Sequence, residues 1–178
     1  VEYSTVGNLH MDLINLTFGL TPKLREVHKL RQANRADLVS LFVGGSPQIF
    51  HGISWMLNDM RPAANYGFNV VEGIYAPTSV FAHEIGHNLG CQHATNDFDG
   101  SIKGVFTNSH GLRFNTTFAG RSYPMRTIMA YGAGPRLGYY SNPSGQVWGS
   151  PTGITNSANN AYTISQTAPM VGSYMTEI

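Results

Sequence analysis

Apolar residues spaced three and four apart predict two helices near the start of the sequence. The first covers residues 8–16, where Leu9, Leu13 and Leu16 fall on one side, and we expect it to lie over a sheet. The second begins at Thr21-Pro22, because Thr is a favoured N-cap and Pro fits the first helical turn. It should run to about Asn34 and turn an apolar stripe inward, formed by Leu24, Val27 and Leu30.

Three stretches in the next part of the sequence favour strands. Residues 37–43 are almost continuously apolar, which is typical of a central parallel strand covered on both faces. Residues 66–72 predict another strand, and Gly52–Leu57 should lie nearby as an edge strand. An edge strand keeps free backbone N–H and C=O groups, so it either pairs with an extended peptide or is covered and binds nothing.

Two more helices follow. A helix that begins within Ala76–Ser79 should bury one apolar face, formed by Phe81, Ile85 and Leu89. Residues 158–171 predict a last helix that is interrupted near Pro169. Since 178 residues are enough to bury one core, these elements predict a single domain of the α/β (α+β) class.

The other face of the third helix carries His83 and His87 with Glu84 beside them. Residues four apart on a helix project from the same side about one turn apart, so the two imidazoles can bind one metal ion. Glu84 lies too far round the helix to join the pair comfortably. It suits a general base that acts on a water activated by the metal.

His93 can complete this site only if the helix breaks. It would face away if the helix continued, so the chain should turn after Leu89, where Gly90 tolerates a left-handed conformation. Three histidines at this spacing, together with the glutamate and the glycine, favour a zinc site over isolated core histidines. A structural zinc site would need a fourth protein ligand, and Cys91 is too close to His93 to bind the same ion.

The stretch His83–His93 resembles the elongated zinc motif of the metzincin metallopeptidases. A second mark follows at Thr127–Gly132, which resembles the Met-turn that places a methionine, here Met129, beneath the zinc-bound histidines. The sequence is most similar to secreted microbial reprolysin-like peptidases. This resemblance covers nearly the whole chain and includes Tyr139–Pro143 after the turn.

The resemblance implies a metzincin-like fold: a twisted mixed sheet with helices in an upper lobe, an irregular lower lobe with a C-terminal helix, and a zinc cleft between the lobes. Metzincin domains usually open with a strand and a long helix, whereas this chain begins at Val1–Tyr3, at a strand end. We therefore expect residues 1–178 to form a single catalytic domain that lacks these two elements. A retained N-terminal fragment or a partner chain should cover the surface left exposed.

A further departure is Ala94, which stands where reprolysins usually carry Asp directly after the third histidine. The resemblance still implies a secreted zinc endopeptidase with Glu84 as general base and three ligands for Zn²⁺: His83, His87 and His93. The alternative function is a catalytically weak, zinc-containing toxin or adhesin-type binding module. The presence of Glu84 argues against it, because a module without turnover does not need the base.

Tyr131 lies two residues past Met129, the spacing at which astacins and serralysins carry a tyrosine near the zinc. This resemblance implies that the phenol binds the metal at rest and then hydrogen-bonds the oxyanion. The alternative is a tyrosine that only packs under the turn.

Substrate selectivity is expected in residues 132–143. The resemblance implies that they form a wall of the pocket for the side chain just after the scissile bond, with candidate residues Arg136, Tyr139 and Tyr140. Arg136 could pair with a substrate carboxylate, and the alternative is a surface arginine beside an apolar pocket. The peptide or protein substrate should lie as an extended strand along Gly52–Leu57.

Composition limits the other partners. Charged residues make up 12% of the chain and the net charge is +1, so neither nucleic acid nor an anionic membrane is expected to bind. Asp97–Gly100 contains half of a calcium loop, but without further oxygen ligands an ordinary Asp/Gly turn is favoured. Cys91, the only cysteine, excludes an internal disulfide and is either a small packed residue or a reactive thiol.

Overall fold

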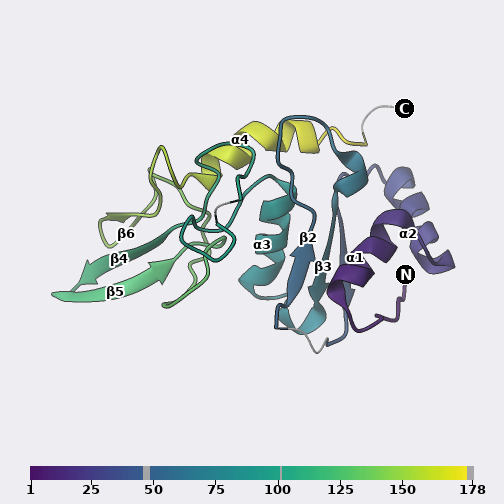
Figure 1. The fold of residues 1–178 in the computed structure, drawn as a ribbon, viewed down its shortest axis with the longest axis horizontal. Helices are drawn as coiled ribbons and strands as arrows, with labels where there is room; N and C mark the ends of the chain where they lie inside the picture. The colour runs from purple at the N-terminus through teal and green to yellow at the C-terminus, as the bar shows by residue number, and fades with distance from the viewer. Residues whose placement is uncertain (46–48, 101, 176–178) are drawn as a thin grey trace. The chain divides into compact units, whose positions relative to one another are not determined.

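The computed structural model describes residues 1–45, 49–100 and 102–175 (Figure 1). Its internal contacts divide the chain into two compact units. The first unit consists of Val1–Trp55, Arg61–Asn88 and Ala168–Ile178, and the second of Met56–Met60 and Leu89–Thr167. Helices and small sheets occur together, as the predicted α/β (α+β) class requires.

The first unit contains a mixed sheet of three strands, β1 (Val39–Val43), β2 (Gly52–Ser54) and β3 (Phe68–Glu72), in the order β1-β3-β2. β1 runs parallel to β3 and β2 runs antiparallel to it, so that Leu41 and Ile53 both lie opposite Val70. All residues of the central strand β3 are buried. The predicted mixed sheet is confirmed.

The prediction that residues 37–43 form the central strand is wrong, because β1 lies at an edge of the described sheet. Apolar side chains of β1 meet apolar neighbours on both faces. Val39 and Leu41 pack against the core cluster, whereas the alternate side chain Phe42 has its ring centre 5.4 Å from that of Phe81. The second face is only partly covered, because Phe42 is 47% exposed, so an apolar run neither guarantees two covered faces nor distinguishes a central strand from an edge strand.

β2 confirms the predicted edge strand, although it is shorter than Gly52–Leu57. Among the described residues it pairs only with β3, and the regular pairing ends at Ser54. The Trp55 N–H still lies 3.4 Å from the Phe68 carbonyl oxygen, but Leu57 is buried outside the strand. The outer edge of β2 is therefore short.

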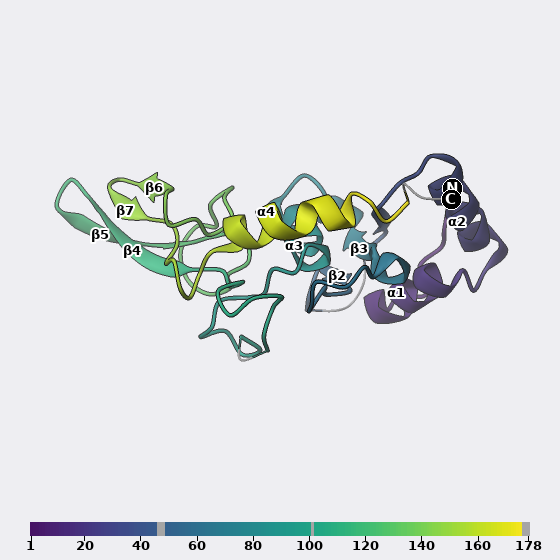
Figure 2. The same cartoon turned by 90° about the horizontal axis from the view of Figure 1, so that it is seen from above.

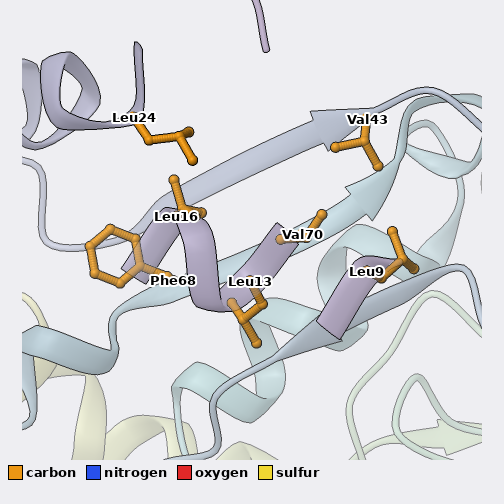
Figure 3. Close-up of a cluster of buried hydrophobic side chains, with 7 residues drawn as sticks. All are labelled: Leu9, Leu13, Leu16, Leu24, Val43, Phe68 and Val70. Atoms are coloured by element: carbon orange, nitrogen blue, oxygen red, sulfur yellow. The ribbon is translucent and has the colours of Figure 1, made fainter. Parts of the chain in front are cut away.

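Helices α1 (Leu9–Phe18) and α2 (Pro22–Ala33) confirm the two predicted N-terminal helices. Side chains cap both, since Asn8 accepts from a backbone N–H of α1 and Thr21 from one of α2. The inward stripe of α2 is narrower than predicted, because Leu30 is 46% exposed. Figure 3 shows the core cluster that the helices form with the sheet: Leu9, Leu13, Leu16, Leu24, Val43, Phe68 and Val70.

The first six residues do not form a strand in the described structure, and a buried carboxylate holds them instead. Asp12 of α1 accepts hydrogen bonds from the Tyr3 hydroxyl at 2.7 Å, from the Val6 N–H at 3.1 Å and from the Thr5 hydroxyl. The Asp12 side chain is fully buried, so these donors replace the water that it loses. The N-terminal segment is thereby attached to α1.

α3 (Ser79–Asn88) packs against β2 and β3. The expectation that its apolar face is the buried one is wrong, because Phe81, Ile85 and Leu89 are only half-buried. The polar face is buried more deeply, and its residues are His83, Glu84, His87 and Asn88. The reason is that part of this face meets polar groups of the sheet and of the segment after β2, which satisfy Glu84 and Asn88.

The second unit contains an antiparallel hairpin, β4 (Arg113–Phe118) and β5 (Arg121–Arg126). A smaller pair, β6 (Gln146–Val147) and β7 (Ser150–Pro151), lies beside it in both views (Figures 1 and 2). The Thr116 hydroxyl of β4 donates to the Val147 carbonyl at 2.9 Å and joins the two pairs. The surrounding loops agree with the predicted irregular lobe, but the β4–β5 hairpin is regular structure that the sequence pattern does not predict.

α4 (Asn160–Val171) is the predicted last helix. Contrary to the prediction, it is not interrupted at Pro169, because this proline lies in the last turn and removes only one helical hydrogen bond. In the described part of the chain, no helix combines the length and the apolar character needed to cross a bilayer.

Candidate metal centre

His83, His87 and His93 lie together within one short stretch of chain. One ring nitrogen of each histidine lies within 4.8 Å of a ring nitrogen of each of the other two. All three residues are buried. The ring centres of His83 and His87 are 4.8 Å apart and the rings are nearly perpendicular, at 88°. Within residues 1–45, 49–100 and 102–175, no other group of His, Cys, Asp or Glu side chains has this geometry.

Gly90 makes the turn that returns the chain toward His93. α3 ends at Asn88, and Gly90 has a φ of +83°. A Cβ atom at this position would lie 2.3 Å from Cγ2 of Val105, so both the conformation and the space require glycine. The predicted break after Leu89 is confirmed to within one residue.

Glu84 is held by the edge strand β2. The Ser54 hydroxyl donates to Oε2 of Glu84 at 2.8 Å, and the carboxylate is buried. Gly52 lies so close that a Cβ atom there would be 2.6 Å from Oε1 of Glu84. β2 therefore positions this carboxylate in two ways. Ser54 donates a hydrogen bond to it, and Gly52 leaves the space that it occupies.

His93 is fixed at three points. Its Nδ1 lies 2.7 Å from Oδ1 of Asp99, its backbone N–H donates to Oε1 of Gln92 at 2.7 Å, and its carbonyl oxygen is 2.8 Å from Nδ1 of His110. An ionised carboxylate can only accept, so Nδ1 of His93 carries the proton. Its Nε2 then keeps the lone pair that a metal ion can bind.

Residues 127–130 form the predicted turn, which the Ala130 N–H closes by donating to the Thr127 carbonyl at 3.0 Å. Met129 is fully buried in this turn. The Tyr131 ring centre lies 4.6 Å from the His93 ring centre, and Tyr131 is 42% exposed. The structure therefore places Tyr131 beside a candidate ligand and in contact with solvent.

Tyr139 and Tyr140 line a pocket of about 610 Å³ in the second unit. Its other side chains are neutral and include Asn142, Gln146, Thr152, Ala161 and Ile164. Arg136 is not among the lining residues, and its guanidinium carbon lies 5.7 Å from the Tyr131 ring centre. Burial raises the pKa of Tyr140, and the neighbouring Cys91 adds to this shift.

Residues 5–141 match the sequence profile of a reprolysin-type group described as metallo-peptidase family M12. The chain belongs to metallo-peptidase family M12. The resemblance to a metzincin-like microbial peptidase is therefore confirmed at the level of the family, and membership of M12 implies a bound metal. The three clustered histidines are the residues that could hold it.

Relatives of this M12 chain are named peptidyl-Asp metalloendopeptidase. The protein of Stenotrophomonas maltophilia (strain R551-3) is 29% identical over 178 residues, which cover 97% of this chain and 40% of that protein. The protein of Xanthomonas campestris pv. campestris is 27% identical over 179 residues, covering 97% of this chain and 39% of the relative. The chain thus spans about 40% of the length of these relatives.

A solved structure titled "Structure of a chaperone-substrate complex" is also similar to the M12 chain. It matches with a TM-score of 0.70 at 17% sequence identity, and the match covers 97% of this chain and 26% of the other. At this identity the likeness concerns the fold alone.

Asn88 holds the end of α3 beside the candidate site, although its sequence position gives little sign of this. Its Nδ2 donates to the Trp55 carbonyl at 2.8 Å and to the Phe68 carbonyl at 3.1 Å, and its Oδ1 accepts from Asn69 at 2.9 Å. The end of α3 is thereby tied to β3 and to the end of β2. The only sign of this role in the sequence is that a polar residue, Asn88, directly follows the second histidine.

Cys91 lies inside the motif and is fully buried. Burial raises the pKa of its thiol, an effect that a weak contact with the Asn160 carbonyl only partly opposes. The thiolate is the reactive form, so the structure favours a packed residue over a reactive thiol.

Proposed function

We propose that this M12 chain carries the active site of a zinc endopeptidase. The observation that carries the proposal is the cluster of three buried imidazoles, with the buried carboxylate of Glu84 directly after the first of them. Imidazole nitrogens suit zinc, and a set of three protein ligands leaves an open position, as in catalytic zinc sites. Asp99 accepts a hydrogen bond from Nδ1 of His93, and metal-binding histidines usually have such a hydrogen-bond partner on the nitrogen that does not bind the metal.

In this proposal His83, His87 and His93 hold the ion. When bound, zinc supplies a Lewis acid that polarises the scissile carbonyl and acidifies water. Glu84 accepts the proton of the attacking water and passes it to the leaving amine as the C–N bond breaks. The Ser54 hydroxyl keeps the carboxylate oriented for both transfers.

Tyr131 is proposed as a donor to the oxyanion of the tetrahedral intermediate. Its ring packs against His93 and its side chain is partly exposed, which supports a phenol that can move between positions near the ligand. The alternative is a tyrosine that only packs beside His93.

The substrate is proposed to be a peptide or protein that lies extended along the outer edge of β2. Within the described residues this edge is unpaired, and Gly52 and Ser54 of the same strand contact Glu84. A peptide paired with β2 would therefore run alongside the strand that holds the general base. Backbone pairing of this kind binds many sequences, so selectivity must come from side chains.

An acidic residue next to the cleaved bond is the proposed selectivity, because the relatives are named peptidyl-Asp metalloendopeptidase. Arg136 is the candidate recognition residue, since a guanidinium can pair with a carboxylate through two hydrogen bonds. The Arg136 guanidinium lies over the Tyr131 ring, so its positive charge is close to the residue that follows the Met129 turn. The alternative is selection of an uncharged side chain by the pocket at Tyr139 and Tyr140.

Cleavage of a proteome-derived peptide library by the zinc-loaded protein tests activity and selectivity together. We expect cuts beside Asp in the wild type and an at least tenfold loss of that preference in Arg136→Ala, with partial recovery in Arg136→Lys. Arg121→Ala, which removes an exposed arginine of β5, is the matched control and should change nothing. Cuts beside Leu or Phe that Arg136→Ala leaves unaltered would overturn the selectivity, and absence of any cleavage would favour the toxin or adhesin-type module.

Zinc is proposed as the functional metal, and calcium is not expected at Asp97–Gly100. Both carboxylates of this stretch are already bonded to protein donors, Asp97 to backbone N–H groups and Asp99 to His93. Secretion is also proposed, and it rests on the resemblance to secreted microbial peptidases.

A further inference from the structure

Two carboxylates in the loop after His93 connect this histidine with the turn around Met129. Asp99 lies 2.7 Å from Nδ1 of His93 through its Oδ1. Oδ2 of Asp97 accepts from the Ala94 N–H at 3.0 Å and from the Tyr131 N–H at 3.1 Å. The two residues are separated only by Phe98, yet they face different partners.

Asp99 acts on the imidazole of His93. A carboxylate accepts a hydrogen bond from Nδ1–H, which selects the tautomer with an unprotonated Nε2 and fixes the rotation of the ring. His93 is the candidate ligand that lies outside α3, so the helix does not set its orientation. The Asp99 contact supplies the orientation that a regular helix supplies to His83 and His87.

Asp97 acts on the backbone. Its side chain is 3% exposed, and one of its oxygens satisfies two N–H groups that are 37 residues apart in sequence, at Ala94 and Tyr131. Its other oxygen lies 3.5 Å from the Arg113 guanidinium, which also donates to the Asn96 carbonyl at 2.7 Å. A buried carboxylate with these partners sets the spacing between the residue after His93 and the residue after the turn.

We propose that Asp97 and Asp99 are positioning residues for the metal site, Asp99 by orienting His93 and Asp97 by joining the His93 loop to Tyr131. The residue directly after His93 is Ala94, which has no carboxylate. The carboxylates that contact this part of the site are those of Asp97 and Asp99, three and five residues after Ala94. The inference rests on the proposed metal site. It does not require turnover, so a failure of the proposed peptidase activity leaves it open to a separate test.

The first test measures zinc affinity by competition with a chelator. Asp99→Ala should weaken binding about 10- to 100-fold, the usual effect of removing the partner of a metal-binding histidine. Asp99→Asn keeps an oxygen acceptor and should lose less. Phe98→Ala is the control in the same loop, because Phe98 is 98% exposed and should leave the affinity unchanged.

The spectrum of the cobalt-substituted protein gives a second reading of the same variants. A shifted visible absorption in Asp99→Ala, with an unchanged apo-protein melting temperature, shows that the geometry at the metal has changed while the fold has not. Wild-type zinc affinity together with a wild-type cobalt spectrum in Asp99→Ala would overturn the role of Asp99.

Amide hydrogen exchange tests Asp97. In Asp97→Ala the Ala94 and Tyr131 amides should both exchange about tenfold faster, whereas Asp99→Ala should leave the Tyr131 amide protected. If Asp97→Ala does not fold, Asp97→Asn gives the same comparison with a smaller change. Wild-type protection of both amides in the folded variant would contradict the proposed connection.

Discussion

Ser54 holds the carboxylate of Glu84 from a neighbouring strand, and this contact can be removed without changing the motif itself. A hydrogen bond to a charged group contributes about 1.5–3 kcal/mol, so a loosened Glu84 should spend much less time in its reactive orientation. We expect Ser54→Ala to lower kcat about tenfold or more, with little change in KM and no loss of zinc.

Ser54→Thr keeps the hydroxyl and should recover most of the rate. Steady-state kinetics with a single quenched peptide, together with the zinc content of each variant, provide the comparison. Full kcat in Ser54→Ala would show that the contact does not matter for catalysis.

The residues of the site differ in how well the sequence predicts them. His83, His87 and Glu84 follow from helical spacing, and His93 follows once Gly90 breaks the helix. Ser54 lies 30 residues before Glu84, so its contact depends on the packing of α3 against β2, which local spacing does not encode. Asp99 lies only six residues from His93, but an irregular loop has no repeat from which a contact can be predicted.

Among the structural elements, the turn at Gly90 is the one on which the position of His93, the proposed third ligand, depends. An alanine in a left-handed conformation costs about 1–2 kcal/mol, and the overlap with Val105 adds about 1–3 kcal/mol. We expect Gly90→Ala to lower the unfolding free energy by the sum of these terms and to weaken zinc binding strongly. Urea unfolding and chelator competition measure the two effects.

Gly120 offers a matched control for this change. It also has a positive φ, of +76°, but a Cβ atom there would meet no atom within 4 Å. Gly120→Ala should therefore lose only about 1 kcal/mol from backbone strain and bind zinc as the wild type does. Equal zinc affinity in the Gly90 and Gly120 variants would contradict the role of the turn.

The elements with local signals are the ones that the sequence predicts well. The N-cap at Thr21 and the proline after it predict the start of α2 to the residue. The β4–β5 hairpin is missed because its turn places Ala119 at a φ of 49°, where Asn or Gly is the usual sign of a hairpin. β1 is predicted as a strand but given the wrong place in the sheet, because an apolar run does not show which neighbours a strand has.

At the scale of the whole molecule, the outer edge of β1 is a candidate surface for pairing with another strand. Within the described residues β1 pairs only with β3, and its Phe42 is 47% exposed. An unpaired strand edge readily accepts another strand, so we expect an additional segment, either a retained N-terminal fragment or a partner chain, to pair with β1.

Intact mass of the undenatured protein, followed by mass under denaturing conditions, detects such a segment. The expected result is a component that stays bound natively and separates on denaturation. A monomer of these 178 residues alone, with rapid exchange at the β1 amides and no tendency to associate, would contradict this expectation.

The central claim is that Glu84 serves the chemistry while the three histidines serve the metal, and Glu84→Gln tests it most directly. The variant keeps the size of the side chain and a hydrogen-bond acceptor for Ser54, but it cannot take a proton from water. The account predicts one zinc ion per chain and a wild-type melting temperature, with peptide hydrolysis slower by about three orders of magnitude or more. His87→Ala should instead lose the metal. Loss of zinc in Glu84→Gln, or hydrolysis at the wild-type rate, would contradict the account.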